Sequence, residues 1–303
     1  MAIIRKTILC TFALLLSPLF VQAAAVAPSV IELSSQRGEV IDSSFRILNT
    51  GASEQVYYLD TLSFDADGED GSPLFTPENN SVTPFLTWFD FPLLEITVPA
   101  QSKVDVPFSV VVPDDVPSGS YHGAITVSTA PSDVVATNGA TIEARIAILV
   151  FLVIEGETVE KLELLDFTLD QTQATLPFGI FKYRIQNQGN VHLAPEGEIV
   201  LKNLFGQVIA TIEANENKAR ILPGSTRTYT VDFGTDLNIL NTVGFQLRHL
   251  VIGPVTAELN VTYSENESLT SQAQLMVIPI ELLIVLATAL LFAGVLYRRL
   301  PRH

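Results

Sequence analysis

The stretch of the sequence with the most promising chemistry is an acidic loop. It carries four carboxylates within six residues, and these belong to Asp65, Asp67, Glu69 and Asp70. Alternate carboxylates around a glycine turn are how a loop gathers the hard oxygen ligands that Ca²⁺ prefers. The EF-hand pattern is incomplete, because it lacks a Glu at the twelfth position. Two interpretations stay open: a weak calcium site, or a solvated acidic loop between two strands.

Trp88 is the only tryptophan, and it lies in the aromatic-rich segment Phe85–Phe91. If its ring is exposed, it could stack against a sugar or anchor a protein partner. If its ring is buried, Trp88 is a core residue that seals one end of a β-sandwich. Trp88 is therefore a binding candidate whose alternative is a purely structural role.

Residues for catalysis are harder to find. A nucleophilic hydrolase needs Ser, His and a carboxylate together, commonly with the Ser in a Gly-x-Ser-x-Gly elbow, and the sequence contains no such elbow. None of the four histidines has a second His at metal-ligand spacing; they are His122, His192, His249 and His303. We therefore predict a non-catalytic protein without a cofactor, apart from the calcium site left open above.

The N-terminal segment has the order of a secretory signal. Two basic residues precede the apolar run Thr7–Leu16, a Ser-Pro pair follows it, and the segment ends in small residues at Ala23. This order predicts a signal peptide over residues 1–23 that is cleaved after Ala23. A first transmembrane helix is the alternative, but the run is short for one. Cys10, the only cysteine, would leave with the signal, so the mature chain would have no thiol or disulfide chemistry.

The C-terminal segment predicts a membrane anchor. Leu275–Tyr297 is apolar except for Glu281 and is followed by Arg298 and Arg299. Its 23 residues would span about 34 Å as a helix, which is enough to cross a hydrocarbon core. Basic residues next to a span stay on the cytoplasmic side. We therefore expect a single-pass helix in the cell membrane over 275–297, a cytoplasmic tail over 298–303, and a folded part outside.

Negative charge is concentrated between these two ends. The chain has 303 residues, of which 17 are basic and 33 acidic, and a formal net charge of −16. Between the two apolar segments 12 basic and 32 acidic residues remain, so that part carries a net charge of −20. Because nucleic-acid binding needs clustered Lys and Arg, we exclude nucleic acid as the partner.

The region between the ends alternates with a period of two, which is typical of β-strands. In Lys103–Val112, apolar residues at the even positions alternate with polar ones such as Asp105 and Ser109. Clusters of Gly and Pro separate such runs. Further strands are predicted at Glu39–Leu48, Gln55–Phe64, Tyr121–Thr129, Ala144–Ile154, Phe178–Asn187, Gly197–Asn203, Val208–Ile212, Arg227–Phe233, Phe245–Ile252 and Val255–Tyr263. No helix is predicted before the anchor.

This pattern predicts an all-β chain with two immunoglobulin-like β-sandwich domains followed by one transmembrane helix. The first domain is expected over 24–156 and the second over 157–272, with Ser264–Gln274 as a spacer to the membrane. Gly119–Gly123 has the Gly-x-Tyr-x spacing of a tyrosine corner, which supports an immunoglobulin-like topology.

Two short motifs recur in both predicted domains. Phe45–Gly51 resembles Tyr183–Gly189 at an offset of 138 residues, and Val98–Ser102 resembles Leu222–Thr226. The Asn-x-Gly of the first pair suits a turn that needs a positive φ. The same order in both halves predicts two copies of one sandwich type, and chance similarity among β-rich sequences is the alternative.

Six short motifs in the first predicted domain also point to a family. They are Ile31-Glu32-Leu33, Gly38-Glu39, Asn49-Thr50-Gly51, Trp88-Phe89-Asp90-Phe91-Pro92, Val112-Pro113 and Pro117–Ala124. Together they make the segment 30–154 resemble the peptidoglycan-binding domain of WxL-interacting proteins, which are bacterial surface proteins. The resemblance implies an immunoglobulin-like sandwich, a C-terminal membrane anchor and peptidoglycan as a ligand.

Two function classes follow from these observations. In the first, the chain is a non-catalytic surface protein that holds a cell-wall polymer (peptidoglycan) or a surface protein partner close to the membrane. In the second, it is an accessory subunit of a secretion, pilus or envelope complex, in which Glu281 pairs with a basic group of another membrane helix. Binding through an exposed strand edge or through a sheet face is possible in the first class.

Overall fold

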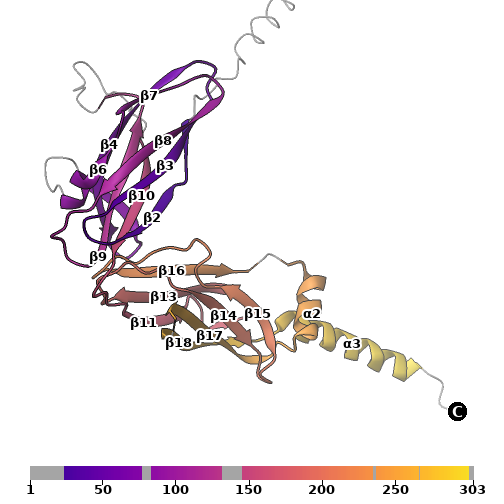
Figure 1. Cartoon of the computed structure of the whole chain (residues 1–303). Helices are drawn as coiled ribbons and strands as arrows, with labels where there is room; N and C mark the ends of the chain where they lie inside the picture. The colour runs from indigo at the N-terminus through magenta and orange to yellow at the C-terminus, as the bar shows by residue number, and fades with distance from the viewer. Residues whose placement is uncertain (1–23, 77–82, 132–144, 235–236, 266, 300–303) are drawn as a thin grey trace, which may run out of the picture. The chain divides into compact units, whose positions relative to one another are not determined.

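The computed structural model describes residues 24–76, 83–131, 145–234, 237–265 and 267–299 (Figure 1). The predicted signal peptide, with Cys10, and the end of the chain, with His303, lie outside these ranges. Contacts within the chain divide it into two compact units. The first is Met1–Phe64, Phe75–Pro117 and Tyr121–Glu155, and the second is Asp65–Leu74, Ser118–Ser120 and Gly156–His303. Two short segments that we expected in the first domain thus group with the second unit.

Within the described residues, ten strands and one 3-10 helix form the first unit and a β-hairpin whose tip, Asp65–Leu74, groups with the second unit. They are β1 (Ala24–Ala27), β2 (Val30–Ser35), β3 (Val40–Asn49), β4 (Gln55–Asp67), β5 (Ser72–Thr76), η1 (Pro84–Trp88), β6 (Phe89–Asp90), β7 (Glu95–Val98), β8 (Ser102–Val111), β9 (Gly119–Ser128) and β10 (Arg145–Ile154). One sheet has the order β1-β3-β8-β6, and the other has the order β2-β10-β9-β4-β5 with β7 paired to β4 (Figure 1). The unit is therefore a two-sheet sandwich.

The core of the first unit follows from the predicted alternation. Val106, Phe108 and Val110 of β8 are at most 2% exposed. Of the residues that alternate with them, Asp105 and Pro107 are exposed and Ser109 is half-buried. β8 pairs with β3 along its whole length, which brings Phe45 beside Val106. Burying a side chain of this size stabilises a fold by about 1.5–3 kcal/mol. The apolar faces of both sheets therefore meet in one layer.

The described part of the second unit contains eight strands and two helices. They are β11 (Leu162–Leu169), β12 (Gln173–Ala174), β13 (Gly179–Asn187), β14 (Glu196–Lys202), β15 (Val208–Glu213), β16 (Thr226–Phe233), α2 (Ile239–Arg248), β17 (Gly253–Ser264), β18 (Glu267–Val277) and α3 (Ile280–Arg299). One sheet has the order β11-β13-β16, and the other has the order β12-β18-β17-β14-β15. The chain is therefore an all-β protein of two sandwiches with a C-terminal apolar helix, as the sequence predicts.

Helix α2 contradicts the strand predicted at Phe245–Ile252. The apolar Phe245 and Leu247 alternate with polar neighbours and imitate a strand over these few residues. A helix forms instead because Asn238 caps it: its side-chain oxygen accepts a hydrogen bond from the Asn241 N–H at 3.0 Å. Together with η1, α2 also shows that the prediction of no helix before the anchor was wrong.

Strand β18 contradicts the spacer predicted at Ser264–Gln274. It pairs antiparallel with β17 from Gly253↔Val277 to Ser264↔Glu267. Leu275 and Val277, which we expected in the membrane helix, are its most buried residues at 2% and 1% exposure. The apolar helix therefore begins at Ile280 rather than at residue 275.

Both copies of the Asn-x-Gly motif close the same kind of turn. Asn49 and Asn187 are fully buried. Each side-chain oxygen accepts a hydrogen bond from the glycine N–H two residues on, at 2.9 Å. Each side-chain NH₂ donates to main-chain carbonyls on either side of the turn, those of Ser53, Val98 and Pro99 for Asn49 and those of Val191 and Ile221 for Asn187. The shared bonds support two copies of one sandwich type.

In the second repeated motif, the residues that correspond in the structure differ by one position from those matched in the sequence. Gln101 and Gly224 are the left-handed residues of the two copies, with φ of 51° and 74°. The next residues, Ser102 and Ser225, each donate a hydroxyl hydrogen bond to a carbonyl three residues before, at 2.8 Å. The two serines therefore correspond at an offset of 123 residues, whereas the prolines matched in the sequence, Pro99 and Pro223, are 124 residues apart.

The tyrosine corner is present in the first unit. The Tyr121 hydroxyl donates a hydrogen bond to the carbonyl of Pro117, four residues upstream, at 3.0 Å. This is the backbone contact by which immunoglobulin-like sandwiches fix the start of the equivalent strand.

Candidate functional site

The acidic loop forms the tip of a β-hairpin. Asp65 and Asp67 lie on the last residues of β4, and the turn at Gly68 leads into β5, so the segment is a β-hairpin. Glu69 turns its carboxylate toward the guanidinium of Arg184. Within the described ranges, no group of three or more His, Cys, Asp or Glu side chains could hold a metal ion. The calcium interpretation of Asp65, Asp67, Glu69 and Asp70 therefore stays a prediction, for which the described residues offer no ready-made ligand cluster.

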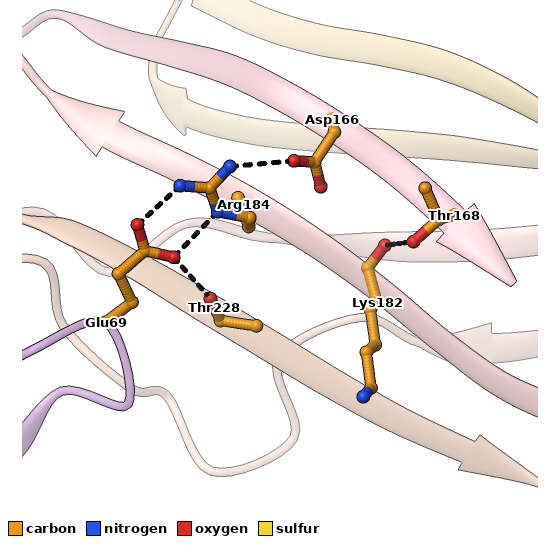
Figure 2. A network of polar contacts seen from close by, with 6 residues as sticks. All are labelled: Glu69, Asp166, Thr168, Lys182, Arg184 and Thr228. Carbon is orange, nitrogen blue, oxygen red and sulfur yellow. Dashed lines mark hydrogen bonds and ion pairs between the residues drawn. The ribbon is translucent and has the colours of Figure 1, made fainter. Parts of the chain in front are cut away.

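Arg184, on β13, connects the hairpin tip to the sheet β11-β13-β16 (Figure 2). Its Nε donates to Glu69 at 2.7 Å, its Nη2 also contacts Glu69, and its Nη1 donates to Asp166 at 3.0 Å. The Thr228 hydroxyl adds a hydrogen bond to Glu69 at 3.1 Å. The hydrogen bonds between Glu69 and Arg184 lower the pKa of the Glu69 carboxyl. The same bonds raise the pKa of the Arg184 guanidinium. Because these side chains are more than a third exposed, we assign the network a positioning role rather than a large stabilising one.

A hydrogen bond to the hairpin tip shows which main-chain groups of β16 point away from β13. The Thr228 N–H donates a hydrogen bond to the Glu69 carbonyl at 2.7 Å. β16 is the last strand of its sheet and pairs with β13 on one side. In an antiparallel pair, alternate residues direct their N–H and C=O groups away from the partner strand. Thr230 and Asp232 therefore present their main-chain groups at the outer edge, in line with Thr228.

A groove of about 390 Å³ runs along this edge. One wall is β16 over 227–232, and the other is the end of β15 and the loop after it, over 212–217 and 219. Three carboxylates and one guanidinium line it; they belong to Glu213, Glu216, Asp232 and Arg227. Arg227 is directed to one end, where it donates to the carbonyls of Gly71 and Arg220 at 2.9 and 3.0 Å. The groove is therefore acidic.

Two stacked tyrosines hold the walls of the groove in place. The rings of Tyr183 and Tyr229 lie 4.8 Å apart with an interplanar angle of 5°. Their hydroxyls donate to the carbonyls of Ala214 and Ala219, at 2.7 and 2.9 Å. Burial raises the pKa of both hydroxyls above the usual range. Since the two acceptors lie on the opposite wall, the groove is preformed.

Trp88 is a core residue, which is the second of the two roles considered for it. It is 6% exposed. Its ring lies 5.5 Å from that of Phe85 in an edge-to-face arrangement and 4.8 Å from that of Tyr121. A ring enclosed in this way favours the structural role of Trp88 over the binding role.

One Ser–His pair forms, but its geometry is structural. The Ser120 hydroxyl lies 2.7 Å from Nδ1 of His192 and also accepts the His192 main-chain N–H at 2.7 Å. In a catalytic triad the serine instead faces Nε2, and Nδ1 faces a carboxylate. His122 packs against Phe64 at 5.0 Å, and the His249 N–H donates to the Phe245 carbonyl at the end of α2.

The C-terminal helix is the other functional element. Ile280–Arg298 is long and apolar enough to cross a membrane, and it is not buried against the rest of the described chain. Glu281 has a partner within the chain: Gln246 of α2 donates to its carboxylate at 3.0 Å, and the Gln246 side-chain oxygen accepts the Leu282 N–H at 3.2 Å. The carboxylate is therefore satisfied without a basic group from another helix.

The alternation in Arg227–Phe233 reveals β16 as a strand but gives no sign that it ends a sheet. The sequence signal for the groove is the acidic pair Glu213 and Glu216, which directly follows the strand predicted at Val208–Ile212.

Comparisons with known proteins return weak structural likenesses. No protein-family model matches the chain, and no curated protein matches it. Among solved structures, the class 5 fimbriae chaperone CfaA is similar with a TM-score of 0.40 and 12% identity, over 82% of this chain and 98% of its own. The chaperone DraB of E. coli has 0.39 and 12%, over 84% and 97%, and the chaperone CupB2 of Pseudomonas aeruginosa has 0.36 and 10%, over 82% and 98%. Likenesses this weak carry no functional inference, and the resemblance to WxL-interacting proteins stays a prediction.

Proposed function

We propose that this chain is a non-catalytic, membrane-anchored envelope protein that binds an extended segment of a partner protein along β16. The observation that carries this proposal is the open edge of β16 beside a preformed groove. An extended peptide can add to such an edge as a further strand, with main-chain hydrogen bonds giving affinity. The Glu69 carbonyl already accepts from Thr228 in this manner, which supports the same bonding at Thr230 and Asp232.

The chemistry of the groove selects the partner. Glu213, Glu216 and Asp232 surround the edge, and Arg227 is engaged at one end. An incoming strand with Lys or Arg at alternate positions would place its charges against these carboxylates, because alternate side chains of a strand point the same way. Charge complementarity of this kind raises specificity and the association rate more than it raises affinity. We therefore expect a short basic segment in an extended conformation.

The membrane anchor completes the proposal. α3 would hold the two sandwiches at the surface of the cell membrane, and the predicted signal peptide would bring them to its outer side. This function belongs to both classes that the sequence suggests, because a partner protein can be a surface protein or a subunit of an envelope complex. Peptidoglycan has no strand-forming main chain along its glycan, so it fits the β16 edge less well and becomes an outcome of the test.

The decisive variant is Thr230→Pro, measured in the full chain in detergent micelles. Proline removes the outward N–H of residue 230 but no ladder bond, and edge strands tolerate it there. The probe is a fluorescent peptide that alternates Lys and Val, with a Glu and Val peptide as the charge control. We expect Thr230→Pro to weaken binding of the basic peptide by about tenfold, the effect of one lost hydrogen bond of about 1.4 kcal/mol. Thr230→Ala, which keeps the N–H, should bind as the parent chain does.

Three results would count against strand addition at β16. One is equal binding of the acidic and basic peptides. Another is equal loss of affinity in Thr230→Pro and Thr230→Ala while the melting temperatures of both variants stay unchanged. The third is retention of the chain on purified peptidoglycan sacculi without any peptide binding.

A further inference from the structure

The end of the second unit from which α3 leaves gathers several elements. β14 ends at Lys202 and β15 begins at Val208, so the turn between them lies at one end of the sheet β12-β18-β17-β14-β15. β17 begins at the same end, since Lys202 pairs with Thr256 near its start, and β18 finishes there, since Val277 pairs with Gly253. α2 directly precedes β17 and α3 directly follows β18, so both helices start or finish there (Figure 1).

Hydrogen bonds join these elements to one another. The Asn203 side chain in the turn donates to the carbonyl of His249, at the end of α2, at 2.8 Å. Gln246 of α2 donates to Glu281 at the start of α3 at 3.0 Å and to the Thr175 carbonyl at 3.0 Å. The turn, α2 and the first turn of α3 therefore form one connected structure.

Large apolar side chains are exposed across this structure. Phe205 is 64% exposed, Leu240 is 84% exposed and Leu247 is 54% exposed. We call the set the apolar end; its members are Leu204, Phe205, Leu240, Leu247, Leu250 and Ile278. Exposed apolar residues that gather on one end of a folded unit mark a surface with an apolar partner.

Helix α2 exposes two leucines although it has an inward face to bury them. Thr242 and Gln246 are buried, at 5% and 1% exposure, and Val243 and Phe245 are half-buried, while Leu240 and Leu247 face outward together with the polar Asn241 and Arg248. A surface helix in water normally buries its apolar face and exposes its polar one. The two exposed leucines are favourable when the surroundings of the helix are apolar, and the buried amide of Gln246 is satisfied from within the chain.

We propose that the apolar end lies in the lipid interface of the membrane, around the point where α3 enters. This inference rests on the proposed anchoring by α3 and adds a second, lateral contact with the bilayer. Continuity favours lipid as the occupant: Ile278 and Ile280 connect the apolar end to the apolar surface of α3 without a break. The bond from Gln246 shields the Glu281 carboxylate where the helix enters. Arg248, exposed next to Leu247, can extend its side chain to the phosphate layer.

The test uses the full chain with Cys10→Ser, reconstituted in phosphatidylcholine nanodiscs that contain lipids spin-labelled near the headgroup. Single cysteines at Phe205→Cys and Leu240→Cys carry a bimane fluorophore. Leu291→Cys reports on α3, and Lys218→Cys is the aqueous control, since it lies beyond the opposite end of β15. We expect spin-labelled lipid to reduce the fluorescence at residues 205 and 240 by about twofold, the result for side chains within about 5–10 Å of the acyl boundary. Residue 218 should stay unaffected.

The outcomes separate the two proposals. Quenching at residue 291 together with 205 and 240 supports both. Quenching at 291 alone, with 205 and 240 resembling 218, overturns the interfacial contact and leaves the anchor intact. No quenching at any position, including 291 with lipids labelled deep in the chain, refutes the anchor itself. Protection of 205 and 240 from aqueous iodide without lipid quenching would assign the apolar end to a protein and overturn the inference.

Discussion

At the scale of single residues, buried asparagines determine the turns of both units. Asn49, Asn187, Asn203 and Asn215 are at most 5% exposed. Each forms hydrogen bonds with main-chain groups through both ends of its amide, as Asn215 does with the Ala219 N–H and with the carbonyls of Pro195 and Ala219. A buried amide costs free energy unless its bonds are made, so these four positions admit few other residues.

Asn187→Ala is the sharpest test of this role. The change leaves the Gly189 N–H and the carbonyls of Val191 and Ile221 without their side-chain partner. We expect the second unit to lose about 2–4 kcal/mol of unfolding free energy, because buried groups left unpaired cost about 1–3 kcal/mol each and some will reach water. Scanning calorimetry of the full chain in micelles measures the effect. Asn217→Ala, at an exposed position of a nearby loop, is the control, and equal melting temperatures for the two variants would contradict the role.

At the scale of elements, the sequence predicts strands well where the alternation is apolar against polar. β3, β8, β13 and β16 appear within one or two residues of their expected bounds. β18 was missed because its inner positions are small or polar near its start, with Ser271 and Ala273 facing inward beside the exposed Gln272 and Gln274. The open edge of β16 could not be predicted at all, since strand order depends on pairing between distant segments. The same holds for the partnership of Gln246 with Glu281.

Because β18 belongs to the second sandwich, the position of a C-terminal truncation decides whether the unit folds. A chain that ends at Gln272, the domain end expected from the sequence, loses Leu275 and Val277, which are 2% and 1% exposed. It also loses the pairing of β12 with Met276 and Val277. We expect the truncation to remove about 3–6 kcal/mol through the two apolar side chains alone. Limited proteolysis should cut this chain within the second unit, whereas a chain that ends at Pro279 should resist, and equal resistance would show that β18 is dispensable.

At the scale of the whole molecule, two opposing features act on a chain from which α3 has been removed. Residues 24–279 carry a net charge of −20, which keeps copies apart in solution. The apolar end, which the membrane would otherwise cover, is then in contact with water and favours association. Charge repulsion is screened by salt, since the Debye length falls from about 30 Å at 0.01 M to about 3 Å at 1 M, while apolar attraction does not weaken in this way. The salt concentration therefore decides which feature dominates.

We expect residues 24–279 to be monomeric at low salt and to associate as salt is raised. The double variant Leu240→Gln and Leu247→Gln should stay monomeric throughout, because it makes the outward face of α2 polar. Sedimentation velocity across a salt series measures both chains. The matched control is Leu93→Gln with Leu94→Gln, two exposed leucines of the first unit at 64% and 58% exposure, and it should associate as the parent does. Association that falls with salt, or that both double variants abolish equally, would show that charge or exposed leucines in general control it and that the apolar end has no particular part.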